Sequence, residues 1–403
     1  MFKTVSLALV LSMAVPLLTG CWDRLELEER AVVLGVSIDV AGEEAEAEES
    51  EVSHVEGSLP LPDHAMVRVG VQIALPGRIP LGPGESGGGK GDSSQTVWVI
   101  DVVGHSIDDA FMNLQQQVSS KLFFGHLRVI VISEALARRG MDNVNDYFRR
   151  NAEVRRMAWM IVSKGKALDL MKAAPKLERV PTLYLMSTLD EGVKLGKFPE
   201  DYIGIYWSHS SKKGQEGFLP YVQMKKEQNV EVSGLAYFRS DKMVGATQPI
   251  EIAGYLGLKG INPAGYRSFI NVANNSFVSA ATQRRSSIKL EIRNGVPHFR
   301  IEVALEVNIE EKIKQEAHIT PEVIRLIQQK QEKNSTLFYE NMLKKTQEKG
   351  SDIFGFGERV RAKKPGYWNS EIKTKEAWQR MYKDVTFDIV VAVNVRRIGA
   401  KAL

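Results

Sequence analysis

The lone cysteine of this 403-residue chain, Cys21, is the feature that most limits what the chain can fold into. A single thiol allows neither an internal disulfide framework nor a thiolate metal cluster. The cysteine follows an almost wholly apolar run, residues 5–18, which has Lys3 before it. A bilayer span needs about 20 apolar residues, so this run is short for a span and is typical of a targeting segment. The fold must therefore come from the residues after 20, held by an ordinary hydrophobic core.

The residues around this cysteine, Leu18, Thr19, Gly20 and Cys21, resemble a bacterial lipobox. In such a motif a signal peptidase cuts before the cysteine, and the thiol carries a diacylglycerol. We expect residues 1–20 to be a signal peptide and Cys21 to be the site of lipid attachment, with a further acyl chain on its freed amino group. Each buried methylene contributes about 0.8 kcal/mol, so two or three acyl chains would anchor a body without a transmembrane helix. A chance cysteine after an ordinary secretory signal is the alternative.

Composition narrows the class of protein further. Hydrophobic residues make up 43% of the chain and charged residues 25%, which is ordinary globular usage and excludes disorder or a multi-span membrane protein. The 53 Lys and Arg against 49 Asp and Glu are too nearly balanced to indicate a nucleic-acid partner. A Glu-rich segment, 43–51, is predicted to be a solvated loop. The rest of the surface is then more basic, which would favour an anionic membrane leaflet, although scattered solubilising charge explains it equally well.

Apolar and β-branched runs predict a mixed α/β (α+β) fold of several domains with mixed and antiparallel sheets. We expect an N-terminal mixed α/β domain over 21–175, a small middle domain over 176–264 and a C-terminal domain over 265–403. In the first two domains strands are predicted at 30–40, 66–75, 96–103, 127–132 and 157–162, helices at 106–122, 141–150 and 182–195, a loop-rich stretch to 228, and a hairpin over 230–247.

The C-terminal domain is predicted to place a long helix against an antiparallel sheet. Asn294-Gly295 joins two strand patterns, 286–293 and 298–309, as a hairpin turn does. Thr320 and Pro321 are suited to begin a helix, and Gly350 to end it. A short helix over 371–382 and a last strand over 385–396 follow. The centre of the long helix, 328–336, has no apolar residue, so we expect one helix whose centre faces solvent or a partner; two separate helices are the alternative.

The search for catalytic chemistry is negative. The seven histidines form no His-Glu-x-x-His pattern, and a Gly-x-Ser-x-Gly elbow is absent. Residues 84–90 match the start of a phosphate loop, but Gly91 stands where Ser or Thr must reach magnesium, so a flexible linker explains them better. We therefore predict no catalytic residue, no metal site and no cofactor other than covalent lipid. The chain is predicted not to be an enzyme.

Two segments are candidates for contact with partners. Four arginines, at 149, 150, 155 and 156, surround Glu153 at a predicted helix-to-strand junction. A structural ion-pair network is the favoured interpretation there and a binding patch the alternative. The aromatic loop from Gly355 to Trp368 either packs on the sheet or forms an interface.

An ordered set of motifs resembles the Ger(x)C family of spore germination lipoproteins over nearly the whole chain after residue 20. The motifs are Cys21-Trp22-Asp23-Arg24, Gly35-Val-Ser-Ile-Asp39, Gly104-x-Ser106-Ile107-x-x-Ala110, Gly125-His126 with the strand to Ile132, Arg149-x-x-x-Glu153-x-Arg155, Gly234 to Phe238 with Asp241-Lys242, Phe354-Gly355-Phe356-Gly357 and Pro365-x-x-Trp368. Segment 43–51 looks like an insertion relative to the family pattern, so no role is carried over to it.

The resemblance implies the C subunit of a nutrient germinant receptor. Such a subunit is lipid-anchored on the outer face of the spore inner membrane, consists of mixed α/β domains and is not an enzyme. It assists integral-membrane A and B subunits, and direct nutrient binding belongs more plausibly to the B subunit. An extracytoplasmic solute-binding lipoprotein is the alternative function, and an envelope hydrolase ranks third. Candidate partner-binding residues are His126, Arg149, Glu153, Arg155, Lys330, Lys333, Phe356 and Trp368.

Overall fold

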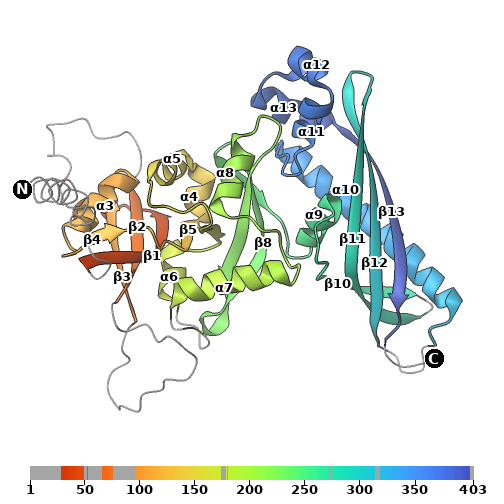
Figure 1. The fold of residues 1–403 in the computed structure, drawn as a ribbon, viewed down its shortest axis with the longest axis horizontal. Coiled ribbons are helices and arrows are strands. Elements are labelled where there is room, and N and C mark those ends of the chain that lie inside the picture. Colours follow the sequence, from red (N-terminus) through yellow and green to blue (C-terminus); the bar gives the residue numbers. More distant parts are fainter. Residues whose placement is uncertain are drawn as a thin grey trace, which may run out of the picture.

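The computed structural model describes residues 29–49, 52, 66–75, 96–173, 178, 180–272, 274–313 and 318–399. Cys21, the rest of the lipobox and the Gly-rich segment 84–90 lie outside these residues. Two lobes, each built on its own sheet, lie side by side (Figure 1). Within the described ranges no helix is both long and apolar enough to cross a membrane.

The first lobe is built on a nine-stranded mixed sheet. Its strands run in the order β3-β2-β1-β5-β6-β7-β8-β9, with β4 paired to β1. The pairs joining β1, β5, β6 and β7 are parallel, and those toward both edges are antiparallel. The strands are β1 (Arg30–Val40), β2 (Val67–Ala74), β3 (Val97–Gly104), β4 (Lys121–Phe123), β5 (Val129–Ser133), β6 (Trp159–Ser163), β7 (Phe218–Met224), β8 (Val230–Arg239) and β9 (Lys242–Ala246).

Helices cover both faces of this sheet, as the continuous apolar sequence of its central strands requires. On β5, Val129 and Val131 pack in one apolar cluster with α6 and α7, while Ile130 and Ile132 pack in another with α3, α4, α5 and α8. Alternate residues of the strand therefore serve opposite layers. The helices are α3 (Ile107–Gln115), α4 (Glu134–Arg139), α5 (Asp142–Arg150), α6 (Ala167–Lys172), α7 (Pro181–Lys194) and α8 (Ile203–Ser211).

Two local predictions in this lobe need correction. The helix expected over 106–122 begins as predicted, with the Ser106 hydroxyl accepting from Asp109 N, but it ends at Gln115. The side-chain Nε2 of Gln115 donates to Val118 O and Ser120 O, and its Oε1 accepts from Leu122 N. These hydrogen bonds hold the chain in a turn. The expected loop to residue 228 contains α8 and β7. Strand β7 was not predicted because it contains a proline, at position 220, and proline argues against a strand inside a sheet.

The Glu-rich segment is also more ordered than the predicted solvated loop. It contains a short helix, α2 (Ala45–Glu48), whose Ala45 is buried. Glu48 pairs with Arg68 of β2 at 2.7 Å. The described part of this segment, residues 43–49, is therefore tied to the sheet by the buried Ala45, by the Glu48–Arg68 ion pair and by Glu49, whose Oε2 lies 3.0 Å from Nε2 of His105.

The second lobe has a four-stranded sheet in the order β10-β11-β12-β13. The strands are β10 (Arg267–Val272), β11 (Asn275–Arg293), β12 (Val296–Lys312) and β13 (Thr386–Arg397). The hairpin at Asn294-Gly295 is confirmed, since both residues have positive φ, 49° and 78°. The β12–β13 pair is parallel rather than antiparallel as expected, because the helices between these strands return the chain to the starting end of β12.

Helix α10 (Pro321–Lys349) has the predicted bounds. The Thr320 hydroxyl accepts from Val323 N, and Gly350 ends the helix with φ +64°. Its apolar-free centre, however, does not simply face solvent or a partner. The Gln328 amide donates to Val393 O and the Glu332 carboxylate accepts from Val393 N, so polar side chains dock this part on β13.

After α10 the chain forms short helices before it enters β13. These are α11 (Phe356–Lys363), α12 (Pro365–Tyr367), η4 (Trp368–Ile372), α13 (Lys375–Met381) and η5 (Tyr382–Asp384). The single helix expected over 371–382 is thus divided: residues up to Ile372 belong to η4, and α13 begins only at Lys375, after Thr374 has capped it.

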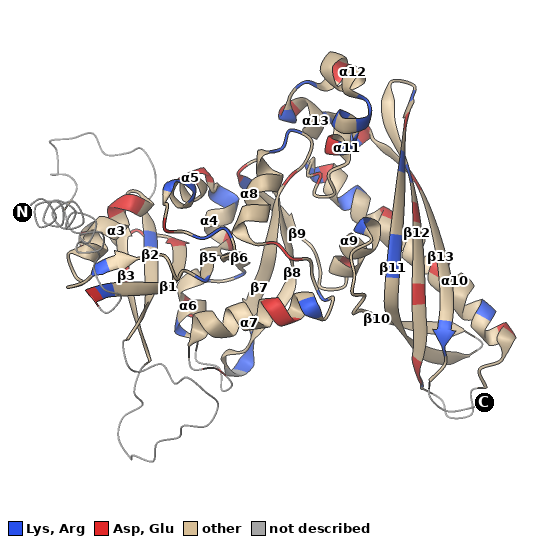
Figure 2. Ribbon diagram, viewed as in Figure 1, with Lys and Arg blue, Asp and Glu red and all other residues tan. Residues whose placement is uncertain are grey.

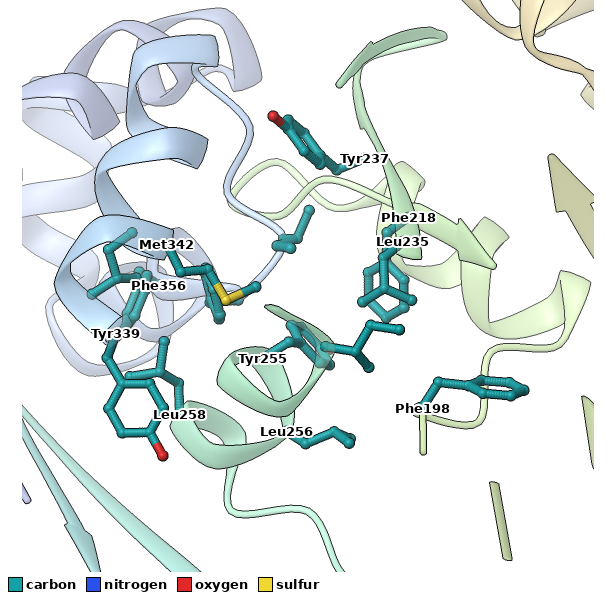
Figure 3. Close-up of a cluster of buried hydrophobic side chains, with 14 of the residues drawn as sticks. Phe198, Phe218, Leu235, Tyr237, Tyr255, Leu256, Leu258, Tyr339, Met342 and Phe356 are labelled. Carbon is teal, nitrogen blue, oxygen red and sulfur yellow. The ribbon is translucent and has the colours of Figure 1, made fainter. Parts of the chain in front are cut away.

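The two lobes share one apolar core, and α9 (Glu251–Lys259) lies in it between them (Figure 3). The ring of Tyr255 is 4.8 Å from that of Phe218 in β7 and 5.5 Å from that of Phe354.

The predicted domain boundary at 175/176 falls between β6 and β7 of a single sheet, whereas the one at 264/265 falls between α9 and β10. Whether three units fold separately stays a prediction.

Candidate partner-binding surfaces and lobe junction

The arginines singled out in the sequence gather on the first lobe where α5 meets β6, and we call Arg128 and the arginines at 149, 150, 155 and 156 the basic surface. Figure 2 shows this concentration of positive charge on and after α5. All except the half-buried Arg128 are exposed. Among the described residues, none of them forms an ion pair with Glu153; the one ion pair they make there joins Arg150 to Asp146 at 2.8 Å. The predicted ion-pair network around Glu153 is therefore wrong.

Glu153 instead braces the neighbouring loop. Its Oε2 accepts from Phe124 N at 2.9 Å, and Asn151 Oδ1 accepts from its backbone N–H. His126, on the braced loop, is half-buried with its ring 6.0 Å from that of Phe123. Burial, followed by the charges of Arg128 and Arg155, lowers the His126 pKa. The imidazole is thus kept neutral at neutral pH beside the guanidinium groups of Arg128 and Arg155.

Arg149, a member of the basic surface, lines a polar groove. Its Nη2 donates to Trp207 O at 3.2 Å and to the hydroxyls of Ser210 and Ser211, and its guanidinium lies 5.4 Å from the Trp207 ring. The groove has a volume of 620 Å³ and also takes in Arg156. Fixed arginine donors at an open groove suit a polar or anionic partner.

The aromatic residues proposed for partner contact lie in the core. Phe356 and Trp368 are each 2% exposed. The Phe356 ring packs 4.7 Å from Phe299 of β12 and 5.0 Å from Phe387 of β13, and the Trp368 ring packs 6.0 Å from Trp378. Of the two interpretations of this loop, packing on the sheet is the one that the structure supports. Neither side chain presents a surface to a partner.

The residue that organises this loop, Asp352, was missed in the sequence. Its Oδ1 accepts from Phe354 N and Gly355 N at 3.1 and 2.9 Å, and its Oδ2 from Gly357 N and Trp378 Nε1 at 2.9 and 3.0 Å. Burial raises the pKa of the carboxyl to about 6 against the opposing effect of these donors. An Asp just after a helix-ending glycine and before a Gly-rich turn is the signal that could have revealed it.

A second buried carboxylate, Glu216, joins the lobes. It is 2% exposed and lies before β7 in the first lobe. Lys375 Nζ is 2.9 Å from its Oε2, and Gln379 Nε2 donates to its Oε1 at 2.7 Å, both from α13 of the second lobe. Its backbone N–H also donates to Asp352 O at 2.8 Å. Charged and backbone bonds thus cross the junction beside the apolar core.

Lys330 and Lys333, the other candidates, are exposed on α10. No ion pair involves either of them within the part of the chain that the structure describes. Their neighbours Gln328 and Glu332 are committed to the sheet. The two ammonium groups therefore remain on the outer side of the helix, available to a partner.

The described residues contain no group of three or more His, Cys, Asp or Glu side chains that could hold a metal ion. In the same part of the chain, two acid–imidazole pairs have largely buried side chains: Glu49 Oε2 lies 3.0 Å from His105 Nε2, and Asp201 Oδ1 lies 3.9 Å from His209 Nδ1. In the second pair the carboxyl group is fully buried. Burial raises the Asp201 pKa well above its ordinary value and lowers that of His209 to about 4. Both groups are therefore biased toward their neutral forms, and the pair is a weak ion pair at most.

Comparison with known proteins defines the class, because two family models of spore germination proteins match this chain. A family model described as "Spore germination protein N-terminal domain" matches residues 23–224, and one described as "Spore germination B3/ GerAC like, C-terminal" matches residues 233–399. The chain accordingly belongs to the Ger(x)C family, as its motifs indicated.

Individual relatives match most or all of the chain. Spore germination protein KC of Bacillus subtilis (strain 168) is 24% identical, over 100% of this chain and 97% of that protein. Spore germination protein GerQC of Bacillus cereus is 22% identical, over 78% of this chain and 85% of that protein. The crystal structure of the GerBC protein has a TM-score of 0.56 at 19% identity, covering 83% of this chain and 95% of that one. The last likeness supports the mixed α+β fold.

Proposed function

We propose that the chain is the lipid-anchored C subunit of a spore nutrient germinant receptor, a non-catalytic subunit needed for receptor assembly and for germination in response to nutrients. The observation that carries the proposal is the match of the two germination family models to residues 23–224 and 233–399, which begins two residues after the lipobox cysteine. Its partners are the membrane, through lipid on Cys21, and the integral-membrane A and B subunits. The body lies on the outer face of the spore inner membrane.

The position of the basic surface is consistent with such an anchor. Arg30, at the start of β1, is nine residues after Cys21, which at full extension spans about 30 Å. The Arg30 guanidinium lies 4.7 Å from the Phe123 ring, whose other neighbour is His126. The lipid attachment therefore keeps this side of the first lobe near the membrane, where exposed arginines are attracted to anionic lipid headgroups.

Copurification tests the proposal. A tagged chain is purified from solubilised inner membranes of dormant spores, and its companions are identified by mass spectrometry. Recovery of a transporter-like protein together with a second integral-membrane subunit is the expected result. Recovery of neither, in detergent that preserves other membrane complexes, would contradict it and favour the alternative, a solute-binding lipoprotein. The unlike architecture of the two lobes already weighs against that alternative, which would place similar lobes around a cleft.

The anchor is tested separately by Cys21→Ala, with Trp22→Phe as the control. We expect Cys21→Ala to leave the fold intact, to release the chain from the membrane fraction and to weaken germination. An anchor acts by raising the effective concentration of the body at its partners. Full germination by an unanchored chain would show that the lipid is not needed.

A further inference from the structure

A cavity of 230 Å³ lies in the second lobe beneath the centre of α10. Apolar side chains from α10, β10, β11 and β12 form most of its wall, together with residues before and in α9. The lining residues include Ile250, Tyr266, Phe269, Ile270, Arg284 and Tyr339. The apolar-free centre of α10 contributes Gln331, Asn334 and Ser335 to this wall.

One charged side chain in the wall, Arg284 of β11, is deeply buried. It is 3% exposed, and its Nη2 donates to Pro263 O at 3.3 Å. Within the described ranges its Nε has no hydrogen-bond partner. The backbone of Arg284 is held on both sides by the Asn262 amide, at 2.9 and 3.0 Å. The guanidinium is therefore held in place, but its Nε–H donor has no acceptor among the described residues.

The charge of Arg284 is also uncompensated. No carboxylate of the described residues lies within ion-pair distance of it, and the cavity wall contains neither Asp nor Glu. The other arginine in the wall, Arg267, differs, because Glu310 pairs with it at 2.5 Å. Burial lowers the Arg284 pKa, and only the nearby Tyr266 and Tyr339 hydroxyls oppose this effect. A buried charge without a partner is costly, which indicates a site completed by a ligand.

The cavity has an apolar entrance. Phe269, which lines it, is 71% exposed, and Ile250 is 44% exposed. An apolar mouth, apolar walls and one unsatisfied cation inside are complementary to an anion carried on an apolar body. A zwitterion fits less well, since its ammonium group would find no carboxylate in the described wall.

We propose that this cavity binds a small monocarboxylate with an apolar body, held by Arg284. The guanidinium would donate to the carboxylate, and the aromatic and aliphatic walls would cover the rest of the molecule. This site goes beyond the proposed receptor function, because neither the anchor nor assembly with other subunits requires it. The binding test on the isolated chain can therefore fail while the receptor proposal stands. Equally, the receptor proposal can fail while the chain still binds the carboxylate.

The volume selects the probe. An apolar cavity of about 150 Å³ holds benzene, so 230 Å³ is enough for a phenyl ring with a short acidic stem. The probe is 3-phenylpropanoate, compared with 3-phenylpropan-1-ol and L-phenylalanine. Binding to the full chain in phosphatidylcholine nanodiscs is measured from isoleucine methyl NMR signals, because Ile270 lines the cavity and reports where the probe binds.

We expect 3-phenylpropanoate to shift the Ile270 signal and to bind about tenfold more tightly than the alcohol, the usual gain from a charged hydrogen bond. L-Phenylalanine should bind more weakly than 3-phenylpropanoate. Arg284→Met should abolish the preference for the acid, whereas Arg285→Met, at the exposed neighbouring position, should retain it.

Equal binding of acid and alcohol by the unaltered chain would overturn the proposal, whether or not Arg284→Met folds. So would an acid preference that survives in a folded Arg284→Met variant. Replacing a buried unpaired guanidinium with a methionine of similar shape is expected to preserve the fold.

Discussion

The indole Nε1 of Trp378 donates to Oδ2 of Asp352 across 3.0 Å, inside the junction between the lobes. Both residues are 1% exposed. The same carboxylate oxygen accepts from Gly357 N, so one side chain fixes the aromatic loop and α13 together. Because Glu216 donates its N–H to the carbonyl of Asp352, the first lobe is held at the same residue. Changes at this point should therefore affect the stability of the whole molecule.

Asp352 should make stability depend on pH. Its pKa is raised from 3.8 to about 6, so the folded state binds the proton more tightly than the unfolded chain. Its contribution is complete below pH 3.8 and is lost as the pH rises through about 6. Relative to Asp352→Asn, the unaltered chain should lose about 2 kcal/mol of stability between pH 4 and 7.

Denaturant unfolding at four pH values measures this difference. Asp384→Asn, at an exposed position, is the control and should keep the pH dependence of the unaltered chain. Parallel stability curves for the unaltered chain and Asp352→Asn would contradict the assignment.

Gly357→Ala should destabilise the protein. A Cβ at this position would lie 2.5 Å from the Trp378 ring and 2.7 Å from Gly214 Cα, across the lobe junction. Overpacking of this kind costs about 1–3 kcal/mol. Gly366→Ala is the matched control, because a Cβ there meets nothing within 4 Å. Thermal unfolding compares the two variants, and equal midpoints would show that the junction can relax.

The Glu216–Lys375 pair should behave as a buried pair. Lys375→Met leaves Glu216 charged and 2% exposed, which should cost about 3 kcal/mol. Glu216→Gln with Lys375→Met should recover part of this loss, since no uncompensated charge remains. A double-mutant cycle by denaturant unfolding measures the coupling. Additive single effects would mean that the pair contributes only as packing.

Charge reversal on α10 tests the exposed lysines as a partner contact. Lys330→Glu with Lys333→Glu should reduce recovery of the other receptor subunits with the tagged chain, because both ammonium groups face outward. The control, Lys363→Glu with Lys364→Glu, makes the same change of charge at exposed positions of the second lobe. Unchanged recovery in both variants would exclude this face of α10.

The basic surface should bind anionic lipid. Arg155→Glu with Arg156→Glu should weaken binding of the Cys21→Ala chain to vesicles containing phosphatidylserine, by about 1 kcal/mol for each charge removed. Vesicle cosedimentation measures the effect, and added salt should reduce binding of the unaltered surface. Equal binding to vesicles of pure phosphatidylcholine would contradict an electrostatic role.

Local signals in the sequence were sufficient where neighbouring residues decide the structure. Thr320, Pro321 and Gly350 predicted both ends of α10, because capping depends on residues within one turn. The parallel pairing of β13 with β12 could not be predicted in this way, since it depends on how the intervening helices pack.

The candidate sites divide along the same line. The motif containing Phe356 could be recognised in the sequence. Aromatic residues in a loop, however, are suited equally to a core and to an interface. Which of the two they form depends on how the loop packs against the sheet, and the local sequence does not give this. Arg284 could not be predicted as a site residue, because a strand that alternates polar and apolar residues does not reveal which polar side chain another element will cover. Cys21 and the lipobox remain predictions from sequence.

The continuous sheet of the first lobe has a consequence for hybrid proteins. The two family models meet between residues 224 and 233, which separates β7 from its antiparallel partner β8. In a chimera of two relatives spliced there, β7 would come from one relative and β8 from the other, and the two strands would have to form the seven residue pairs that join them here. Either half alone would expose an unpaired strand edge. Among the described strands, no pair joins the two sides of a splice between α9 and β10. Exchange of the second lobe at that point should yield folded hybrids more readily than exchange at the limits of the family models.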